Sequence, residues 1–104
     1  MIFIETDIFT EDLKDLLSDD EYSDFQMYLA ENPLAGDVIQ QTSGLRKVRW
    51  AIQGRGKRGG IRVIYYYVLP DSQIRLLLIY KKGKKDDLTL EQKKILRQLN
   101  ERWL

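Results

Sequence analysis

The sequence contains neither cysteine nor histidine among its 104 residues. Without cysteine, disulfides and thiolate metal sites are excluded, which fits a reducing compartment. Without histidine, the commonest general base and the commonest zinc ligand are both missing. Any acid–base chemistry must therefore come from other side chains.

Long apolar runs are missing as well. An acid, Glu5, already interrupts the N-terminus, and no basic flank precedes an apolar stretch there. We therefore expect no signal peptide, no transmembrane helix, no contact with membranes and a cytoplasmic location. A chain of this length, 43% apolar, predicts one domain over residues 1–104 with a single hydrophobic core rather than disorder.

The small net charge of +1 conceals a strong segregation of charge along the chain. Residues 1–44 carry eleven acids against Lys14 alone, and residues 45–85 carry twelve bases against Asp71 alone. The remaining residues, 86–104, hold four of each sign. A cationic half of this kind suggests a polyanionic partner. The acids of the first half are read as the solvated faces of helices.

The first half of the chain predicts one strand and two helices. Residues 2–4 form a short apolar run, and an amphipathic pattern follows from Phe9 to Leu17. Ser18-x-x-Glu21 has the form of a capping box, so a second helix begins near Asp19. It ends at Asn32, because the residue before a proline is pushed out of the α region.

The second half predicts three strands and one helix. Residues 45–52, 60–69 and 73–81 are rich in β-branched and aromatic side chains and are separated by turn residues, which favours an antiparallel meander. The second run is apolar on both faces, so both sides of the sheet must be covered. Thr89-x-x-Gln92 caps a last helix with one apolar stripe, formed by Leu88, Ile95, Leu99 and Trp103. The order β-α-α-β-β-β-α defines an α+β domain in which two N-terminal helices pack on a small antiparallel sheet.

Cations concentrate in three places in this second half. Along the first strand, period two places Lys47 and Arg49 on one face and Val48 and Trp50 on the other. The loop 54–60 sets three cations among four glycines, and Arg62 follows inside an apolar strand. The last strand ends in the cationic run 80–85. An antiparallel meander brings Arg62 and this strand end to the same end of the sheet, where they can form a phosphate site.

Each of these signals also has a purely structural reading. Glycine-rich cationic loops are common as flexible hairpins, and a charged strand end is often merely solvated. Arg62 can instead be paired with an acid, for which Glu5 in the first strand is the candidate. Asp86 and Asp87 can be read as a metal pair, although acids there also favour the dipole of the following helix.

Metal-free cleavage of RNA suits this inventory better than metal-dependent hydrolysis, so we expect no metal and no cofactor. The 2′-OH attacks the adjacent phosphate once a base removes its proton, and fixed cations stabilise the charge that develops. In the absence of histidine the base must be a lysine or a tyrosine. Neighbouring cations lower the pKa of a lysine, whereas an arginine can only bind charge.

Four stretches carry a resemblance to a known family. They are residues 32–39 (N-P-x-x-G-D-V-I), 44–49 (G-L-R-K-V-R), 54–66 (G-x-G-K-R-G-G-x-R-V-I-Y-Y) and 80–88, which begins Y-x-K and ends D-L. With them the whole chain resembles the HigB branch of the RelE/ParE toxin superfamily. Gln41 and Ser43 depart from the pattern, since related chains tend to have glycine there, and Gly83-Lys84 replaces a more usual Asn-Glu.

The resemblance implies a RelE-like fold and the toxin of a type II toxin–antitoxin system, a ribosome-dependent mRNA endonuclease that inhibits translation. It implies as partners the ribosome, mRNA and a helix-turn-helix antitoxin of the HigA type, with DNA bound only through the antitoxin. The residues that correspond to the family's catalytic cleft are Lys57, Arg62, Lys82 and Tyr80. The residues expected to contact RNA or the ribosome are Arg46, Lys47, Arg49, Arg55, Arg58, Lys81 and Lys84. Two alternatives stay open: a non-catalytic RNA- or ribosome-binding module, and an inactive toxin that acts only in an antitoxin–DNA complex.

Overall fold

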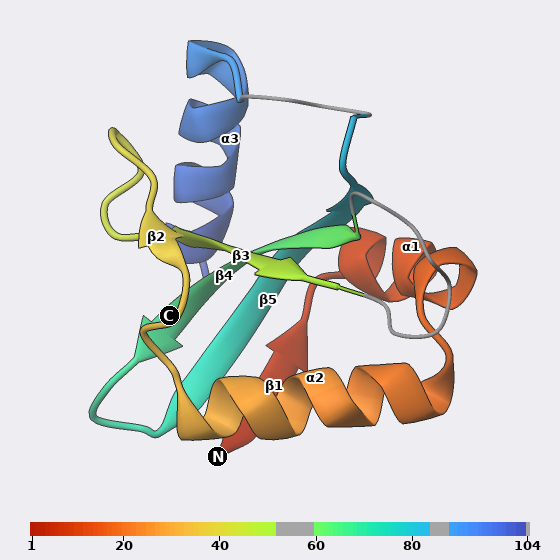
Figure 1. The fold of residues 1–104 in the computed structure, drawn as a ribbon. Helices are drawn as coiled ribbons and strands as arrows, with labels where there is room; N and C mark the ends of the chain where they lie inside the picture. The colour runs from red at the N-terminus through yellow and green to blue at the C-terminus, as the bar shows by residue number, and fades with distance from the viewer. Residues whose placement is uncertain (52–59, 84–87, 104) are drawn as a thin grey trace.

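A five-stranded sheet with helices on both faces forms the core of the structure (Figure 1). This computed structural model describes residues 1–51, 60–83 and 88–103. The elements are β1 (Ile2–Glu5), α1 (Asp7–Leu16), α2 (Asp19–Glu31), β2 (Asp37–Val38), β3 (Arg46–Trp50), β4 (Ile61–Val68), β5 (Gln73–Lys81) and α3 (Leu90–Glu101). The predicted α+β class and the predicted order of its main elements are confirmed. No helix within the described ranges is both long and apolar enough to cross a membrane.

The sheet differs from the expected antiparallel meander at its two edges. Its strand order is β1-β5-β4-β3-β2, and β1 runs parallel to β5, from Ile2 beside Gln73 to Glu5 beside Leu76. The sheet is therefore mixed. At the other edge the two-residue strand β2 pairs with β3. Neither feature was predicted, because periodicity does not give pairing direction and two residues are too few to show a period.

The helix boundaries follow the capping signals in the sequence. The Ser18 side chain accepts from the amide of Glu21, and the Glu21 carboxylate accepts from the amide of Ser18. Thr89 and Gln92 make the same reciprocal pair at the start of α3. α2 ends at Glu31, immediately before Asn32-Pro33, as predicted.

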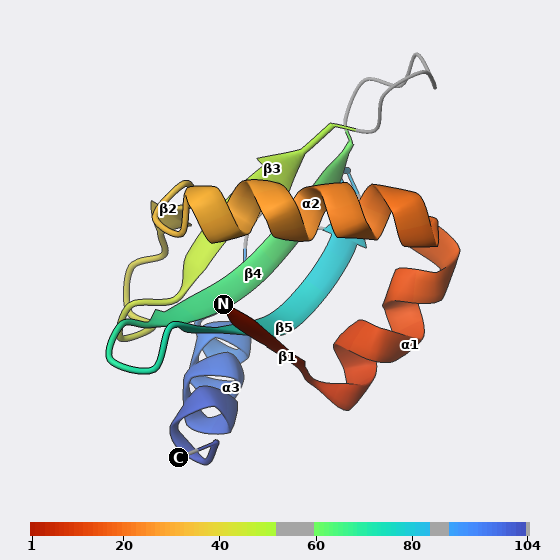
Figure 2. The ribbon, with the colours of Figure 1, turned by 90° about the horizontal axis from the view of Figure 1, so that it is seen from below.

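Two apolar clusters cover the two faces of the sheet. The face covered by α1 and α2, here the α1/α2 face, buries Phe9 and Phe25 against Val48, Val63 and other strand residues. The opposite face, here the α3 face, buries a smaller cluster: Leu45, Ile64, Leu77 and Leu96. Figure 2 shows α2 crossing in front of the strands while α3 lies behind them. β4 contributes to both clusters, so the prediction that the sheet is covered on both sides is confirmed.

The predicted apolar stripe of α3 is wrong in part. Ile95 and Leu99 are 53% and 39% exposed, and the buried residues of the helix are Leu96 and Asn100. The helix is rotated because a polar contact sets its orientation, in which Arg75 of β5 donates to the backbone and side-chain oxygens of Asn100. Periodicity counts apolar side chains and does not register such a contact.

A β-bulge decides which way the end of β5 faces. Ile64 pairs with Leu78 and Tyr65 pairs with Leu76, so Leu77 is an extra residue in β5. Strict alternation from Leu76 would turn Tyr80 to the α1/α2 face. The bulge shifts the alternation by one residue and turns Tyr80 to the α3 face, where it packs beside the smaller cluster.

Glu5 does not serve as the partner of Arg62 that the sequence suggested as one alternative. Its carboxylate accepts hydrogen bonds from the hydroxyls of Tyr22 in α2 and Thr10 in α1, and so ties β1 to both helices. Burial, and then the Glu5 carboxylate, raise the pKa of Tyr22 above its usual value. The neutral phenol is thus favoured in the folded state, and the stability it contributes is present below pH 10 and lost at higher pH.

Gln41 and Ser43, the positions where related chains tend to have glycine, both adopt left-handed backbone conformations. Their φ angles are 67° and 61°. The loop around them is held by Thr42, which is fully buried, donates to the carbonyl of Ile39 and accepts from the amide of Leu45. The chain therefore keeps its loop conformation at a cost that glycine would not have.

Replacing Ser43 by glycine is expected to stabilise the protein by about 1 kcal/mol, because a left-handed conformation costs a non-glycine residue about 1–2 kcal/mol. The freedom that glycine adds to the unfolded chain offsets part of this gain. Urea unfolding measures the change. Gln40→Gly, at an exposed neighbouring position without a positive φ, is the control and is expected not to stabilise. Equal effects of the two substitutions would contradict the argument.

Candidate nucleic-acid interface

Arg62 lies in the middle of a cross-strand row on the α3 face. In the register of the sheet it is opposite Arg49 of β3 on one side and Tyr80 of β5 on the other. Directly opposite side chains of neighbouring strands have Cβ atoms about 5 Å apart. Arg49 and Arg62 are thus two cations held side by side by backbone pairing. Like charges in this position destabilise a sheet, and a bound anion removes the repulsion.

The end of β5 lies against the start of β4, as the meander predicted. The amide of Lys82 donates to the carbonyl of Gly60 at 3.2 Å, and Lys82 itself is exposed. Tyr80 is half-buried. Of the remaining cations predicted here, Arg55, Lys57, Arg58 and Lys84 lie outside the described residues. Arg62, Tyr80 and the backbone of Lys82 are brought to one end of the sheet.

β3 presents its cations as period two predicted. Val48 and Trp50 join the cluster on the α1/α2 face, and Leu45 is buried on the α3 face. Lys47 and Arg49 therefore lie on the α3 face with Arg62. We call Lys47, Arg49 and Arg62 the cationic row. Neither Lys47 nor Arg49 makes an ion pair with a described residue.

Arg46 lies apart from the cationic row and has a structural contact. Its guanidinium donates to the carbonyl of Gly36 at 2.7 Å and, more weakly, to that of Leu34 at 3.4 Å. Tyr65 contacts the same segment, which connects α2 to β2. Its hydroxyl accepts from the amide of Gly36 and donates to the carbonyl of Pro33. Burial raises the pKa of Tyr65. Arg46 thus fixes the connection between α2 and β2, on the opposite face from Arg62.

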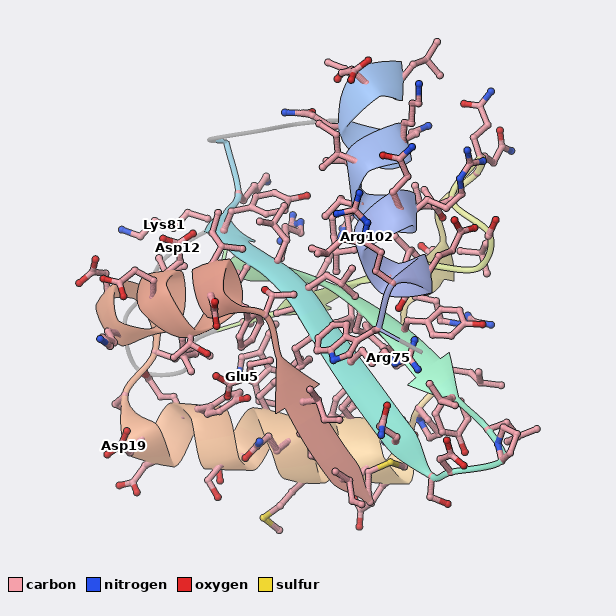
Figure 3. All side chains as sticks on the ribbon, turned by 180° about the vertical axis from the view of Figure 1, so that it is seen from behind. Glu5, Asp12, Asp19, Arg75, Lys81 and Arg102 are labelled. Atoms are coloured by element: carbon pink, nitrogen blue, oxygen red, sulfur yellow. The ribbon has the colours of Figure 1, made fainter. Side chains whose placement is uncertain are left out.

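Lys81 is also separated from the cationic row. It pairs in register with Ile61, which belongs to the α1/α2 cluster, and it lines a cavity with Asp12 and Asp15 of α1. Figure 3 shows Lys81 beside Asp12. On that side the cationic strand end thus has acids of α1 nearby, whereas the cationic row lies on the α3 face.

Two cavities that share lining residues lie beside the β3 part of the cationic row. The larger, about 700 Å³, runs beside β3 between α2 and β2, and Lys47 and Arg49 are among its lining residues. The smaller, about 290 Å³, is lined by Ile39, Lys47, Leu88 and Lys93. They share Ile39 and Lys47, so Lys47 lies where the two meet. The lining residues of the two cavities thus extend from Lys93 of α3, through Lys47, to Arg49 of β3.

Sequence reasoning missed three of the residues that line the smaller cavity. Residues 86–104 are balanced in charge, so Lys93 did not stand out, and Leu88 was assigned to packing alone. One signal was available for Lys93, which lies in the first turn of a capped helix, where the helix dipole favours an acid. A cation at such a position suggests a role other than helix stability.

Comparison with known proteins shows the fold. No protein-family model matches the chain. Among solved structures, the isolated E. coli RelE toxin has a TM-score of 0.57 at 11% identity, with 99% of this chain and 98% of that chain covered. A chain of the intact E. coli RelBE toxin–antitoxin complex gives the same TM-score and identity over 81% of this chain and 98% of that chain. The chain therefore has a RelE-like fold, as the resemblance implied.

Proposed function

We propose that the chain is the toxin of a type II toxin–antitoxin system and acts in the cytoplasm as a ribosome-dependent endonuclease on translated mRNA. The observation that carries the proposal is the register of the sheet, which places Arg62 between Arg49 and Tyr80 on a face that also presents Lys47. This arrangement suits a phosphodiester that gains charge during reaction. The RelE-like fold and the HigB-like sequence stretches support the same reading.

The proposed reaction is an intramolecular transesterification within the RNA. A base removes the proton of the 2′-OH, and the 2′ oxygen bonds to the adjacent phosphorus. The bond from phosphorus to the 5′ oxygen of the next nucleotide breaks, and that oxygen takes up a proton. The products are a 2′,3′-cyclic phosphate and a 5′-OH. The atoms balance without metal or cofactor.

The cationic residues at this end of the sheet, together with Tyr80, have distinct roles in this proposal. Arg62 and Arg49 bind the phosphate oxygens, because a guanidinium remains charged and donates from a planar fork. The base is a lysine, with Lys57 and Lys82 as the candidates implied by the family. Tyr80 positions Arg62 across the strand pair. Arg55, Arg58 and Lys84 supply further contacts to RNA or the ribosome.

The proposed partners follow from the same resemblance. The E. coli RelE toxin forms a complex with an antitoxin, RelB. For this chain we propose a helix-turn-helix antitoxin of the HigA type, which would also supply any contact with DNA. The ribosome would present the message as a single strand, the form that fits the cavities beside β3.

The test is induction of the chain without an antitoxin, followed by primer extension on translated messages. We expect growth to stop and discrete new RNA ends to appear at fixed positions within codons. Purified chain is expected to cut mRNA only when ribosomes are present. Growth arrest without new ends would instead indicate a module that binds without cutting. Normal growth in the presence of folded protein would indicate an inactive toxin.

A further inference from the structure

The smaller cavity brings together two lysines from distant parts of the sequence. Lys47 comes from β3 and Lys93 from the first turn of α3, and both are partly buried. The wall between them is apolar and consists of Ile39 and Leu88. The volume of about 290 Å³ is just below the roughly 300–1,000 Å³ that small-ligand sites occupy.

The two lysines give this cavity a positive charge, although Asp37 of β2 lies directly opposite Lys47 in the register of the sheet. Neither Lys47 nor Lys93 makes an ion pair with a described residue. The positive end of the α3 dipole adds to the same charge, since Lys93 lies in the first turn. The Thr89–Gln92 capping box engages the amides of Thr89 and Gln92, and the lysine side chains are the charged donors that an anion would meet.

The position of Lys47 relates this cavity to the cationic row. Lys47 and Arg49 are two residues apart on one face of a strand, a separation of about 7 Å. Successive phosphates of an extended nucleic-acid strand have a similar spacing. An RNA whose scissile phosphate is bound by Arg49 and Arg62 therefore presents its neighbouring phosphate to Lys47.

We propose that the cavity between Lys47 and Lys93 binds the phosphate next to the scissile one in single-stranded RNA, with the adjoining base or ribose against Ile39 and Leu88. This inference rests on the proposed function, because it takes RNA as the substrate. It adds α3 to the substrate-binding surface and makes Lys93 a substrate-binding residue. The apolar wall makes the site suited to a nucleotide rather than to a bare phosphate ion.

The experiment measures binding separately from cleavage. A fluorescent single-stranded oligonucleotide with 2′-O-methyl riboses cannot react, so its anisotropy reports binding by the whole chain at increasing salt. Lys93→Ala is expected to weaken binding by about tenfold at low salt. It is also expected to reduce the slope of log K against log salt by about 0.7, the value for one phosphate contact in a single strand.

Controls separate a phosphate contact from general effects on α3. Lys94→Ala removes the same charge from the neighbouring exposed position, and it is expected to leave affinity and slope unchanged. Lys93→Arg keeps the charge and is expected to restore both. Thermal unfolding of each variant establishes that the fold is intact.

The outcomes distinguish the inference from the proposed function. If Lys93→Ala and Lys94→Ala bind the oligonucleotide equally, the cavity site is overturned, even where the natural chain still cuts translated mRNA. If Lys93→Ala weakens binding to ribosomes without mRNA but not binding to the oligonucleotide, the cavity site for substrate RNA is overturned in favour of a contact with ribosomal RNA. The natural chain could instead bind the oligonucleotide in a Lys93-dependent way and yet cut no translated message. That result would refute the proposed cleavage and support the binding site.

Discussion

Arg62→Ala is expected to reduce mRNA cleavage by roughly 10²–10³-fold and to relieve growth arrest, because one fixed donor to a developing charge is worth about that much in rate. Arg62 lies on the central strand β4, near one end of the sheet, and is held opposite Arg49 and Tyr80, so its guanidinium needs little ordering when substrate binds. Arg62→Lys keeps the charge but loses the planar fork, and we expect an intermediate rate. Primer extension with ribosomes and mRNA measures both variants.

The controls for this prediction use another arginine and the stability of the variant. Arg102→Ala removes an exposed arginine at the end of α3 and is expected to leave cleavage unchanged. Arg62 is partly buried, so its replacement is checked by urea unfolding before activity is compared. A folded Arg62→Ala protein that still stops growth at the natural level would refute the proposed chemistry.

Arg62 also illustrates how much of the candidate site could be predicted. A cation in an otherwise apolar strand was visible in the sequence, and the meander order placed it near the end of β5. The pairing of Arg62 with Tyr80 was not visible, because the register of β4 and β5 depends on a bulge at Leu77 that no local pattern signals. The pairing with Arg49 depends on the register of β3 and β4, which the period of each strand does not give. Lys81 and Arg46 were grouped with the RNA or ribosome contacts from the family resemblance, and the structure places both on the α1/α2 face.

The fold was predicted well where the signals are local. Capping boxes at Ser18 and Thr89 gave the starts of α2 and α3, and apolar runs gave the longer strands. The parallel pairing of β1 with β5 depends on contacts between residues about 70 positions apart, and sequence patterns do not contain that information. The rotation of α3 was missed for a related reason, since it depends on a polar contact between Arg75 and Asn100.

Arg75→Met is expected to lower the free energy of unfolding by about 1–3 kcal/mol, because it leaves a buried oxygen without its donor. Arg75 is only 4% exposed and lies with its guanidinium 5.8 Å from the ring centroid of Tyr66 and 5.7 Å from that of Trp103. Figure 3 shows it between β5 and the end of α3. For a chain of about 100 residues, each kcal/mol lost lowers Tm by roughly 4–8 °C.

A second variant identifies which interaction is lost. The backbone oxygen of Asn100 still accepts from the amide of Trp103 at 3.2 Å, so Arg75→Met deprives the buried side-chain oxygen of Asn100 and the part-buried side-chain oxygen of Gln73. Replacing Asn100 too, in Arg75→Met/Asn100→Leu, is expected to recover most of the stability, because removing both polar partners together costs much less than removing one. Equal losses in the single and double variants would instead attribute the contribution of Arg75 to its packing on Tyr66 and Trp103.

The same pair of variants tests whether the anchor of α3 matters to RNA binding. Lys93 lies seven residues before Asn100, about 10 Å along the helix, so a helix loosened at its Arg75 contact no longer holds Lys93 beside Lys47. We therefore expect Arg75→Met to reduce the salt dependence of oligonucleotide binding as Lys93→Ala does, and the double variant to restore it. Arg102→Met, which removes an exposed arginine from the same end of α3, is expected to change neither stability nor binding. If the Arg75→Met protein is measurably destabilised but binds the oligonucleotide with a normal salt dependence, the contact of Arg75 with α3 does not contribute to binding at the cavity.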